Sequence, residues 1–283
     1  MVAQFRNLQA GRLPAATLKY LVLCSYLVLT VFPILWTFSN SFRTNDQIFT
    51  SIRLIPEQFS LENYRNLLES SNLLLAFYNS LSVTLLSLAG LIVCVVPLCF
   101  VLSRYKFRGS VWLYFYFILA IFIPSITLLA STFKIFQIVG FLGHQYPIAF
   151  VYISHQLPLS ILLIASYMQM IPASLDEAAI IDGCGPWQLF SRIVLPLTQN
   201  GIVTVLILSF VNIWNDYIYA LLLLPKTEFK TLTVALAAVK TEFAVSYGMV
   251  SAAVIIAVIP MMLFYLIVKE RLMNGMVSGA VKG

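Results

Sequence analysis

Charged residues are scarce in this chain. Aspartate, glutamate, lysine and arginine make up only 10% of its 283 residues, whereas 60% are hydrophobic, and the mean hydropathy is +0.92. Soluble domains carry about 25% charged residues, so this composition excludes an ordinary soluble protein. We expect an integral membrane protein of the all-α class, with the lipid bilayer around it.

Groups that perform chemistry in enzymes are also few. The four cysteines show no C-x-x-C spacing, and the two histidines, His144 and His155, are isolated from each other and interpreted as packing residues. No G-x-x-x-x-G-K-[ST] motif is present, so ATP and magnesium should bind to another chain. We therefore expect no catalytic residue, no metal and no cofactor in this chain, and no nucleic-acid partner.

Six apolar runs are present, and each is close to the ~20 residues that cross a bilayer as a helix. They cover residues 20–38, 77–102, 111–133, 147–167, 202–224 and 247–268. The first run is interpreted as a retained anchor, since no small-residue cleavage site follows it. The prediction is a six-span domain over residues 20–268, between an N-terminal segment, 1–19, and a C-terminal tail, 269–283.

Positive charges indicate the orientation of these spans. Ten of the 17 lysines and arginines lie on the side of the two termini, and three of them, Arg104, Lys106 and Arg108, crowd one short turn. Because positive residues in short loops resist translocation, both termini should be cytoplasmic. The predicted location is a bacterial-type cytoplasmic (inner) membrane.

A polar stretch, residues 172–196, separates the fourth and fifth apolar runs. Ser174 followed by Glu177 is a capping-box pattern, which predicts that a short helix begins there. Gly183 can adopt the left-handed conformation that ends a helix, and Pro186 suits the first turn of a second helix. The second helix should carry an apolar stripe of Trp187, Phe190 and Val194. The stretch predicts a helix-turn-helix outside the membrane.

Three segments of this stretch stand at a characteristic spacing. Glu177-Ala178-Ala179 is followed after three residues by Gly183, and after nine more by Ile193-Val194-Leu195-Pro196. This pattern resembles the EAA loop of importer permeases in the ATP-binding-cassette class. The paired alanines would leave a low helix face that can enter a cleft, and Glu177 would offer a charge to a basic partner residue. The alternative is an amphipathic connector without a partner.

Polar residues also interrupt the fifth apolar run. Asn212, Asn215, Asp216 and Tyr219 stand at positions i, i+3, i+4 and i+7 of the predicted helix and therefore share one face. Buried charges are costly in a membrane, so such a face points to a water-filled path or to a neighbouring helix. Both alternatives remain open: the four residues are candidates for the path of a hydroxylated solute, or they hold helices together by hydrogen bonds.

Further segments narrow the resemblance to carbohydrate-uptake permeases of maltose type. They are Phe59-Ser60-Leu61-Glu62-Asn63-Tyr64, the basic turn 102–109, Trp214-Asn215-Asp216, and the ending Ser278-Gly279-Ala280-Val281-Lys282-Gly283. The ending resembles the tail that reaches the ATPase dimer in the smaller of the two permease subunits.

The resemblance implies a subunit of a binding-protein-dependent importer for a sugar, with an oligosaccharide expected. Its partners would be a second, different permease chain, two ATPase subunits that bind ATP and magnesium, and an extracytoplasmic sugar-binding protein. The chain would form half of the translocation pathway and couple to the ATPase through its cytoplasmic EAA loop. An ion-coupled secondary transporter is the alternative, although such proteins usually show repeated halves or several intramembrane charges.

Overall fold

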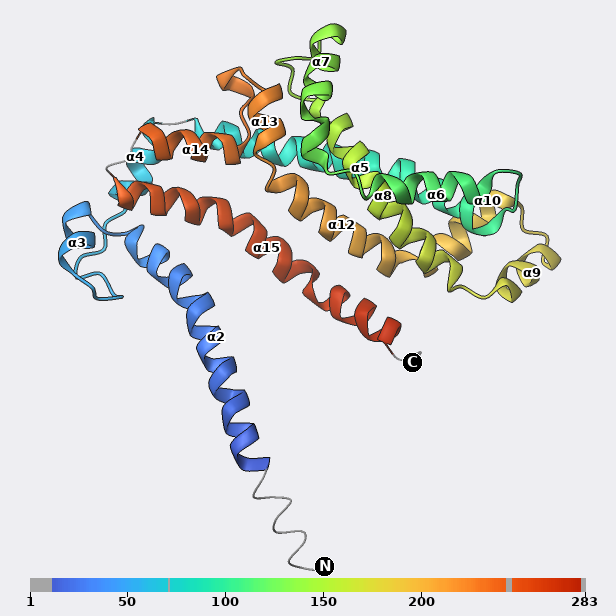
Figure 1. The fold of residues 1–283 in the computed structure, drawn as a ribbon, viewed down its shortest axis with the longest axis horizontal. Coiled ribbons are helices and arrows are strands. Elements are labelled where there is room, and N and C mark those ends of the chain that lie inside the picture. The colour runs from blue at the N-terminus through green and yellow to red at the C-terminus, as the bar shows by residue number, and fades with distance from the viewer. Residues whose placement is uncertain (1–11, 71, 243–245, 281–283) are drawn as a thin grey trace, which may run out of the picture. The chain divides into compact units, whose positions relative to one another are not determined.

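The computed structural model describes residues 12–70, 72–242 and 246–280, which are mostly helical and contain no β-strand (Figure 1). The described residues pack as two compact units. One comprises the described part of Met1–Ser71 and of Val239–Val258, and the other comprises Asn72–Ala238 and the described part of Ile259–Gly283.

The first unit contains α2 (Arg12–Asn40), α3 (Asn45–Thr50), α4 (Glu62–Ser70) and the start of α15 (Tyr247–Ala280). The Arg43 side chain, which is 1% exposed, organises the loop between α3 and α4. Its guanidinium donates hydrogen bonds to the carbonyl oxygens of Ser51 and Arg53 and lies 5.6 Å from the Trp36 ring centroid. The buried guanidinium thus satisfies carbonyl groups of this loop that have no partner in regular secondary structure.

The start of α15 packs tightly within the first unit. A Cβ atom on Gly248 would lie 2.6 Å from the Arg43 carbonyl oxygen and 2.6 Å from the Asn63 amide nitrogen. The same amide nitrogen donates hydrogen bonds to the carbonyls of Ser41 and Arg43. Only glycine fits at this position, because the nearest neighbours are backbone and a side chain that is already hydrogen-bonded.

Most of the second unit lies between residues 72 and 242. Its helices are α5 (Leu73–Arg104), α6 (Ser110–Ala120), α7 (Leu129–Val139), α8 (Ile148–Gln169), α9 (Ala173–Ile181), α10 (Pro186–Gln188), α11 (Leu195–Leu197), α12 (Gln199–Trp214), α13 (Ile218–Leu223) and α14 (Leu232–Glu242), joined by the 3-10 turns η1 (Ser125–Leu128) and η3 (Thr227–Phe229) and the π-helical turn η2 (Leu189–Val194). The α5 and α8 helices pack most extensively against each other, and α12 packs against both. Their shared core includes Leu91, Val95, Ile161, Ile164 and Val205.

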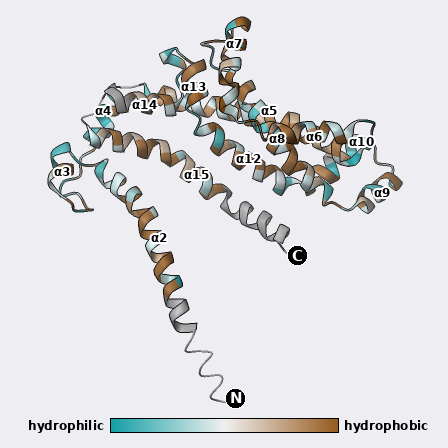
Figure 2. Cartoon of the chain, viewed as in Figure 1, coloured by the Kyte–Doolittle hydropathy of each residue, from teal (hydrophilic) through white to brown (hydrophobic). Residues whose placement is uncertain are grey.

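Within the described residues, four helices are long and apolar enough to cross a membrane by length and composition. They contain Leu18–Asn40, Leu73–Arg104, Ile148–Gln169 and Tyr247–Ile267, and Figure 2 shows the hydrophobic residues that run along α2, α5, α8 and α15. Two bent helix pairs would raise the number to six if each pair forms one span. The structure therefore supports an all-α membrane protein, while the count of six spans stays a prediction.

The third apolar run, 111–133, is bent rather than straight. The helix Ser110–Ala120 and the segment Ser125–Val139 meet at 92°. Pro124 lies in the break, has no backbone N–H and disfavours helical geometry for Ile123, so the helix ends before it. Proline thus accounts for the bend.

The prediction of one continuous helix over the fifth run, 202–224, is wrong. The α12 helix ends at Trp214, and α13 begins only at Ile218. In this break, the polar groups of Asp216 form hydrogen bonds with residues outside α12. Its carboxylate accepts a hydrogen bond from the Ala220 N–H, and its carbonyl accepts one from the Thr233 hydroxyl. These bonds replace the helical ones, as expected for a residue type that competes with the backbone for hydrogen bonds.

Candidate functional site

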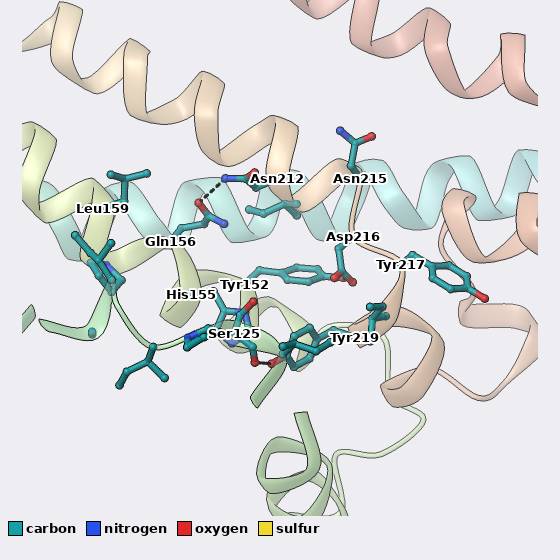
Figure 3. Close-up of a pocket in the computed structure, with 18 residues that line it drawn as sticks. Ser125, Tyr152, His155, Gln156, Leu159, Asn212, Asn215, Asp216, Tyr217 and Tyr219 are labelled. Carbon is teal, nitrogen blue, oxygen red and sulfur yellow. Dashed lines mark hydrogen bonds between the residues drawn. The ribbon is translucent and has the colours of Figure 1, made fainter. Parts of the chain in front are cut away.

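A cavity of about 700 Å³ lies where both broken helices meet α8, within the second unit (Figure 3). Its walls come from the bend around Pro124, from the middle of α8 near Pro158, and from the break between α12 and α13. Its volume is in the range of small-molecule sites in proteins. Irregular backbone at membrane depth is tolerated where it lines such a cavity, because water or protein groups can then satisfy the freed peptide groups.

Asp216 supplies the carboxylate of this cavity, and protein groups already bind it. The Tyr152 hydroxyl donates a hydrogen bond of 2.8 Å to Asp216 Oδ2, and the Ala220 N–H donates one of 3.0 Å to the same oxygen. The carboxylate therefore joins α8 to the first turn of α13. Its position favours a role in holding the break in shape over a role as an open charge.

Tyr219 closes another side of the cavity. Its hydroxyl donates a 2.5 Å hydrogen bond to the Ser125 carbonyl oxygen, and its ring lies edge to face on His155 with centroids 4.8 Å apart. The side chain is 4% exposed. Tyr219 thus ties α13 to the bend of the third apolar run, and the Ser125 carbonyl, which follows a proline, gains a partner.

Polar side chains from several segments line the cavity, and those of Asn212 and Asn215 are among the exposed ones. Asn212 Nδ2 lies 3.4 Å from Gln156 Oε1, and within the described residues this is the only hydrogen bond of the two side-chain amides. Amides offer both donors and acceptors, and the neighbouring phenol rings of Tyr152 and Tyr219 offer apolar faces. Such a surface can bind a neutral, hydroxylated molecule without charge pairing.

The structure brings together the four residues predicted to form one polar face. Asn212, Asn215, Asp216 and Tyr219 all line the cavity, although the expected helical face of four does not exist. Sequence reasoning missed the contribution of α8. Tyr152, His155 and Gln156 stand at positions i, i+3 and i+4 of that helix and line the same cavity. The sequence feature that could have indicated this contribution is the polar stripe that these three residues form in the otherwise apolar fourth run.

The helix-turn-helix predicted over residues 172–196 is present as α9 followed by α10, η2 and α11. Gly183 has φ of +82°, the Cys184 N–H donates to the Ala179 carbonyl, and the Gly183 N–H donates to the Ile180 carbonyl. This pair of bonds is a Schellman motif, which ends a helix with a left-handed residue. The predicted conformation of Gly183 is confirmed.

The capping box expected at Ser174 is absent. The N-cap of α9 is Pro172, with no side-chain cap, and the Pro172 carbonyl accepts a hydrogen bond from the Leu175 N–H. The helix therefore starts two residues earlier than predicted, which leaves Ser174 inside the first turn. Proline fixes its own φ at about −65°, and Pro172, with φ of −58°, precedes the first helical residue without a capping side chain.

Ala178 and Ala179 of α9 face different ways, so the expected low face of paired alanines is wrong. Ala179 is 4% exposed and belongs to the core, whereas Glu177 and Ala178 are exposed. Successive helical residues are separated by about 100° in a helix of 3.6 residues per turn, so neighbours cannot share one face fully. Ile181, 85% exposed, lies outside the core too.

The second half of the loop anchors it to the bundle. Phe190 and Val194 of the predicted apolar stripe are buried in the core, whereas Trp187 is 73% exposed although its ring lies 5.4 Å from that of Phe190. Ile193 and Leu195 are half-buried against the same core. Pro196 is exposed in α11, and the pair of α10–α11 and α12 is bent by 68°.

The predicted ATPase-contacting tail lies partly beyond what the structure describes. Backbone helix α15 continues from Tyr247 to Ala280, which includes Ser278, Gly279 and Ala280. Val281, Lys282 and Gly283 lie outside the described residues. Among the residues whose placement is described, no group of three or more histidine, cysteine, aspartate or glutamate side chains could hold a metal ion.

Comparisons with known proteins agree on one family. Residues 88–276 match the family described as binding-protein-dependent transport system inner membrane component. The trehalose transport system permease protein SugB of Mycobacterium tuberculosis is 32% identical over 253 residues, which cover 89% of this chain and 92% of that protein. The galactooligosaccharides transport system permease protein GanQ of Bacillus subtilis is 29% identical over 269 residues, covering 94% and 95%.

A solved structure shares the fold. It is the crystal structure of a bacterial ABC transporter involved in the import of the acidic polysaccharide alginate, and one of its chains matches with a TM-score of 0.81 at 22% identity. The match covers 90% of this chain and 95% of that chain.

Proposed function

We propose that this chain, which belongs to the family of binding-protein-dependent transport system inner membrane components, is the permease subunit of an ATP-driven sugar importer. The chain is a membrane-embedded transport component and not an enzyme. Relatives named for trehalose and for galactooligosaccharides support a sugar, and an oligosaccharide in particular. Membership of this family leaves the ion-coupled secondary transporter without support.

The cavity at the two helix breaks is the observation that carries this proposal. Its exposed polar groups include the amides of Asn212 and Asn215, and its only carboxylate among the described lining residues, Asp216, is held by Tyr152 and Ala220. A neutral sugar needs hydrogen bonds and aromatic faces rather than an opposite charge. We assign Asn212, Asn215, Asp216 and Tyr219 to the sugar path, the first two as direct contacts and the last two as its supports.

ATP and magnesium belong, in this proposal, to two separate ATPase subunits below the membrane. The exposed residues Glu177 and Ala178 of α9, with the turn at Gly183, would contact the ATPase, while Ala179, Ile193 and Leu195 hold the loop to the bundle and Pro196 ends it. The tail residues Ser278 to Gly283 would reach the same partner. A second, different permease chain would complete the path, and an extracytoplasmic binding protein would deliver the sugar.

One contact supports the proposed orientation, in which both termini and the polar loop are cytoplasmic. Arg104, at the end of α5 where the basic turn begins, forms an ion pair with Asp176 of α9. The C-terminal ends of α5 and α8 therefore lie at the same end of the helix bundle, as a topology in which α5 and α8 cross the membrane in the same direction requires. The dense positive charge of that turn indicates the cytoplasmic side.

Reconstitution tests the proposal. The chain would be co-expressed with its neighbouring permease and ATPase genes, placed in proteoliposomes with ATP inside, and supplied with the cognate binding protein and radiolabelled trehalose or a galactooligosaccharide mixture outside. We expect uptake that requires ATP, the binding protein and this chain together. Uptake driven by a proton or sodium gradient without ATP would overturn the proposal.

A further inference from the structure

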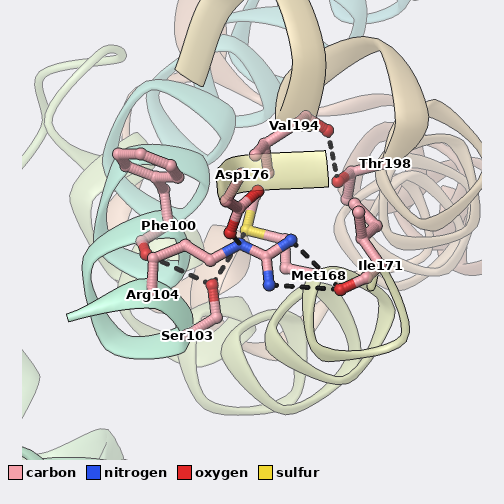
Figure 4. Close-up of polar contacts among 8 residues, drawn as sticks. All are labelled: Phe100, Ser103, Arg104, Met168, Ile171, Asp176, Val194 and Thr198. Atoms are coloured by element: carbon pink, nitrogen blue, oxygen red, sulfur yellow. Dashed lines mark hydrogen bonds and ion pairs between the residues drawn. The ribbon is translucent and has the colours of Figure 1, made fainter. Parts of the chain in front are cut away.

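One guanidinium joins three segments at the end of the bundle that carries the polar loop (Figure 4). Arg104 is the last residue of α5, and its Nε lies 3.0 Å from Oδ2 of Asp176 in the first turn of α9. Its two terminal nitrogens lie 3.3 and 3.4 Å from the carbonyl oxygen of Ile171, just beyond the end of α8. The planar fork of arginine allows these contacts to be made at once.

The Arg104–Asp176 pair is shielded from water, unlike the other ion pairs of the described residues. Its side chains are 10% and 15% exposed, whereas those of Arg53–Glu57 are 75% and 63% exposed. Exposed pairs contribute little, because water screens them and the side chains remain mobile. A shielded pair is held in one geometry, since separating it would leave an unpaired charge in a poorly hydrated place.

The pair lies on the inward face of the helix that presents Glu177 outward. Ala179, one turn after Asp176, is buried in the same core, and Glu177 and Ala178 are exposed. Pro172 separates α8 from α9, so no continuous helix links them. The backbone around Pro172 alone would let α9 rotate relative to α8. The contacts of Asp176 and Ala179 oppose that rotation.

We propose that the Arg104–Asp176 pair is a strut that makes α9 move as one body with α5 and α8. A force applied to the outward face of α9 then reaches the two helices that form most of the bundle core, instead of being lost in rotation at Pro172. Arg104 and Asp176 are positioning residues in this account, because neither touches sugar or nucleotide. The inference rests on the proposed function, in which the outward face of α9 meets the ATPase.

The test is the number of sugar molecules imported per ATP hydrolysed, measured in proteoliposomes of the complete transporter. This ratio does not depend on how much folded protein is present, so a variant that only reduces folding leaves it unchanged. We expect Arg104→Gln and Asp176→Asn to lower the ratio at least tenfold, while the ATPase still co-purifies. Arg108→Gln, which neutralises an exposed arginine of the same turn, is the matched control and should keep the wild-type ratio.

Two further variants keep the test decisive if the single variants fold poorly. Arg104→Met combined with Asp176→Leu removes both charges, so no unpaired charge remains buried; the ratio should still be low. Arg104→Lys keeps the charge but loses the fork, and its ratio should lie between those of wild type and Arg104→Gln. A wild-type ratio in the Met–Leu variant, with the ATPase bound, would overturn the strut and leave the proposed function intact. Failure of the unmodified chain to bind an ATPase would instead contradict the proposed function.

Discussion

The Tyr152 hydroxyl donates a hydrogen bond of 2.8 Å to the Asp216 carboxylate, joining the middle of α8 to the break between α12 and α13. The same carboxylate accepts the Ala220 N–H in the first turn of α13. One acid therefore satisfies a phenol and a free peptide group that the break would otherwise leave without partners. A cavity of stable shape follows from this arrangement, because the break cannot shift without losing both bonds.

Replacing this phenol should loosen the cavity. Tyr152→Phe removes a hydrogen bond to a charged group, and we expect it to lower stability by about 1.5–3 kcal/mol. Tyr217→Phe is the control, since Tyr217 lines the same cavity but its hydroxyl makes no hydrogen bond within the described residues. Thermal unfolding of the purified transporter measures the difference. Equal unfolding midpoints for the two variants would show that the Tyr152–Asp216 bond contributes nothing.

The turn after α9 should depend on one glycine and not on its neighbour. Gly183 has φ of +82° with open space around it, so Gly183→Ala should cost about 1–2 kcal/mol through backbone strain alone. Gly185 has φ of −73° and equally open surroundings, so Gly185→Ala is a matched control without strain. We expect sugar uptake to fall several-fold in the first variant only. Equal uptake in both would argue that the shape of this turn has no role in transport.

Charge reversal on the outward face of α9 should weaken the hold on the ATPase. Glu177 is exposed and forms no ion pair within the described residues, so Glu177→Lys leaves the fold intact and presents the wrong charge to a basic partner residue. The amount of ATPase that co-purifies should fall at least tenfold. Glu228→Lys, a charge reversal at the exposed turn η3, should leave co-purification unchanged. If the Glu177→Lys variant co-purified as much ATPase as the wild type, the ATPase would have to contact a different part of this chain.

Shortening the chain tests the predicted role of its end. Removing Ser278 to Gly283 deletes five small or polar residues and one valine, a segment that offers little apolar surface to a membrane core. We expect unchanged abundance in the membrane but less ATP hydrolysis in response to the sugar-loaded binding protein. Unchanged stimulation would mean that the last six residues do not contact the ATPase.

The sequence was sufficient where local physics decides the structure. The long apolar runs follow from the bilayer thickness, and the conformation of Gly183 follows from the need of a helix end for a left-handed residue. The break after Trp214 could not be found this way, because it depends on Tyr152 and Thr233, which are distant in sequence from Asp216. Ser174 was misassigned for a local reason: Pro172, two residues earlier, already starts the helix.

The inward and outward faces of α9 were also beyond sequence reasoning. The pattern Glu177-Ala178-Ala179 marks a helix with small residues, but which alanine is buried depends on how α9 packs on the core around Phe190 and Val194. That packing is set by the Arg104–Asp176 contact and by Ile171, which come from two other segments. These contacts join residues that are far apart in the chain, so a single sequence does not reveal them directly.

The accessibility of Asn212 to water tests most directly the claim that the cavity is the sugar path. In a variant without the four native cysteines, Asn212→Cys should react with a membrane-impermeant thiol reagent, and trapped ATP should change the rate. Leu29→Cys, in the middle of the apolar stretch Leu18–Asn40, is the control and should stay unlabelled. The account predicts labelling at position 212 with the transporter fully assembled. Absence of labelling in every nucleotide state, together with loss of the partner permease, would show that this polar cluster holds helices together and lines no path.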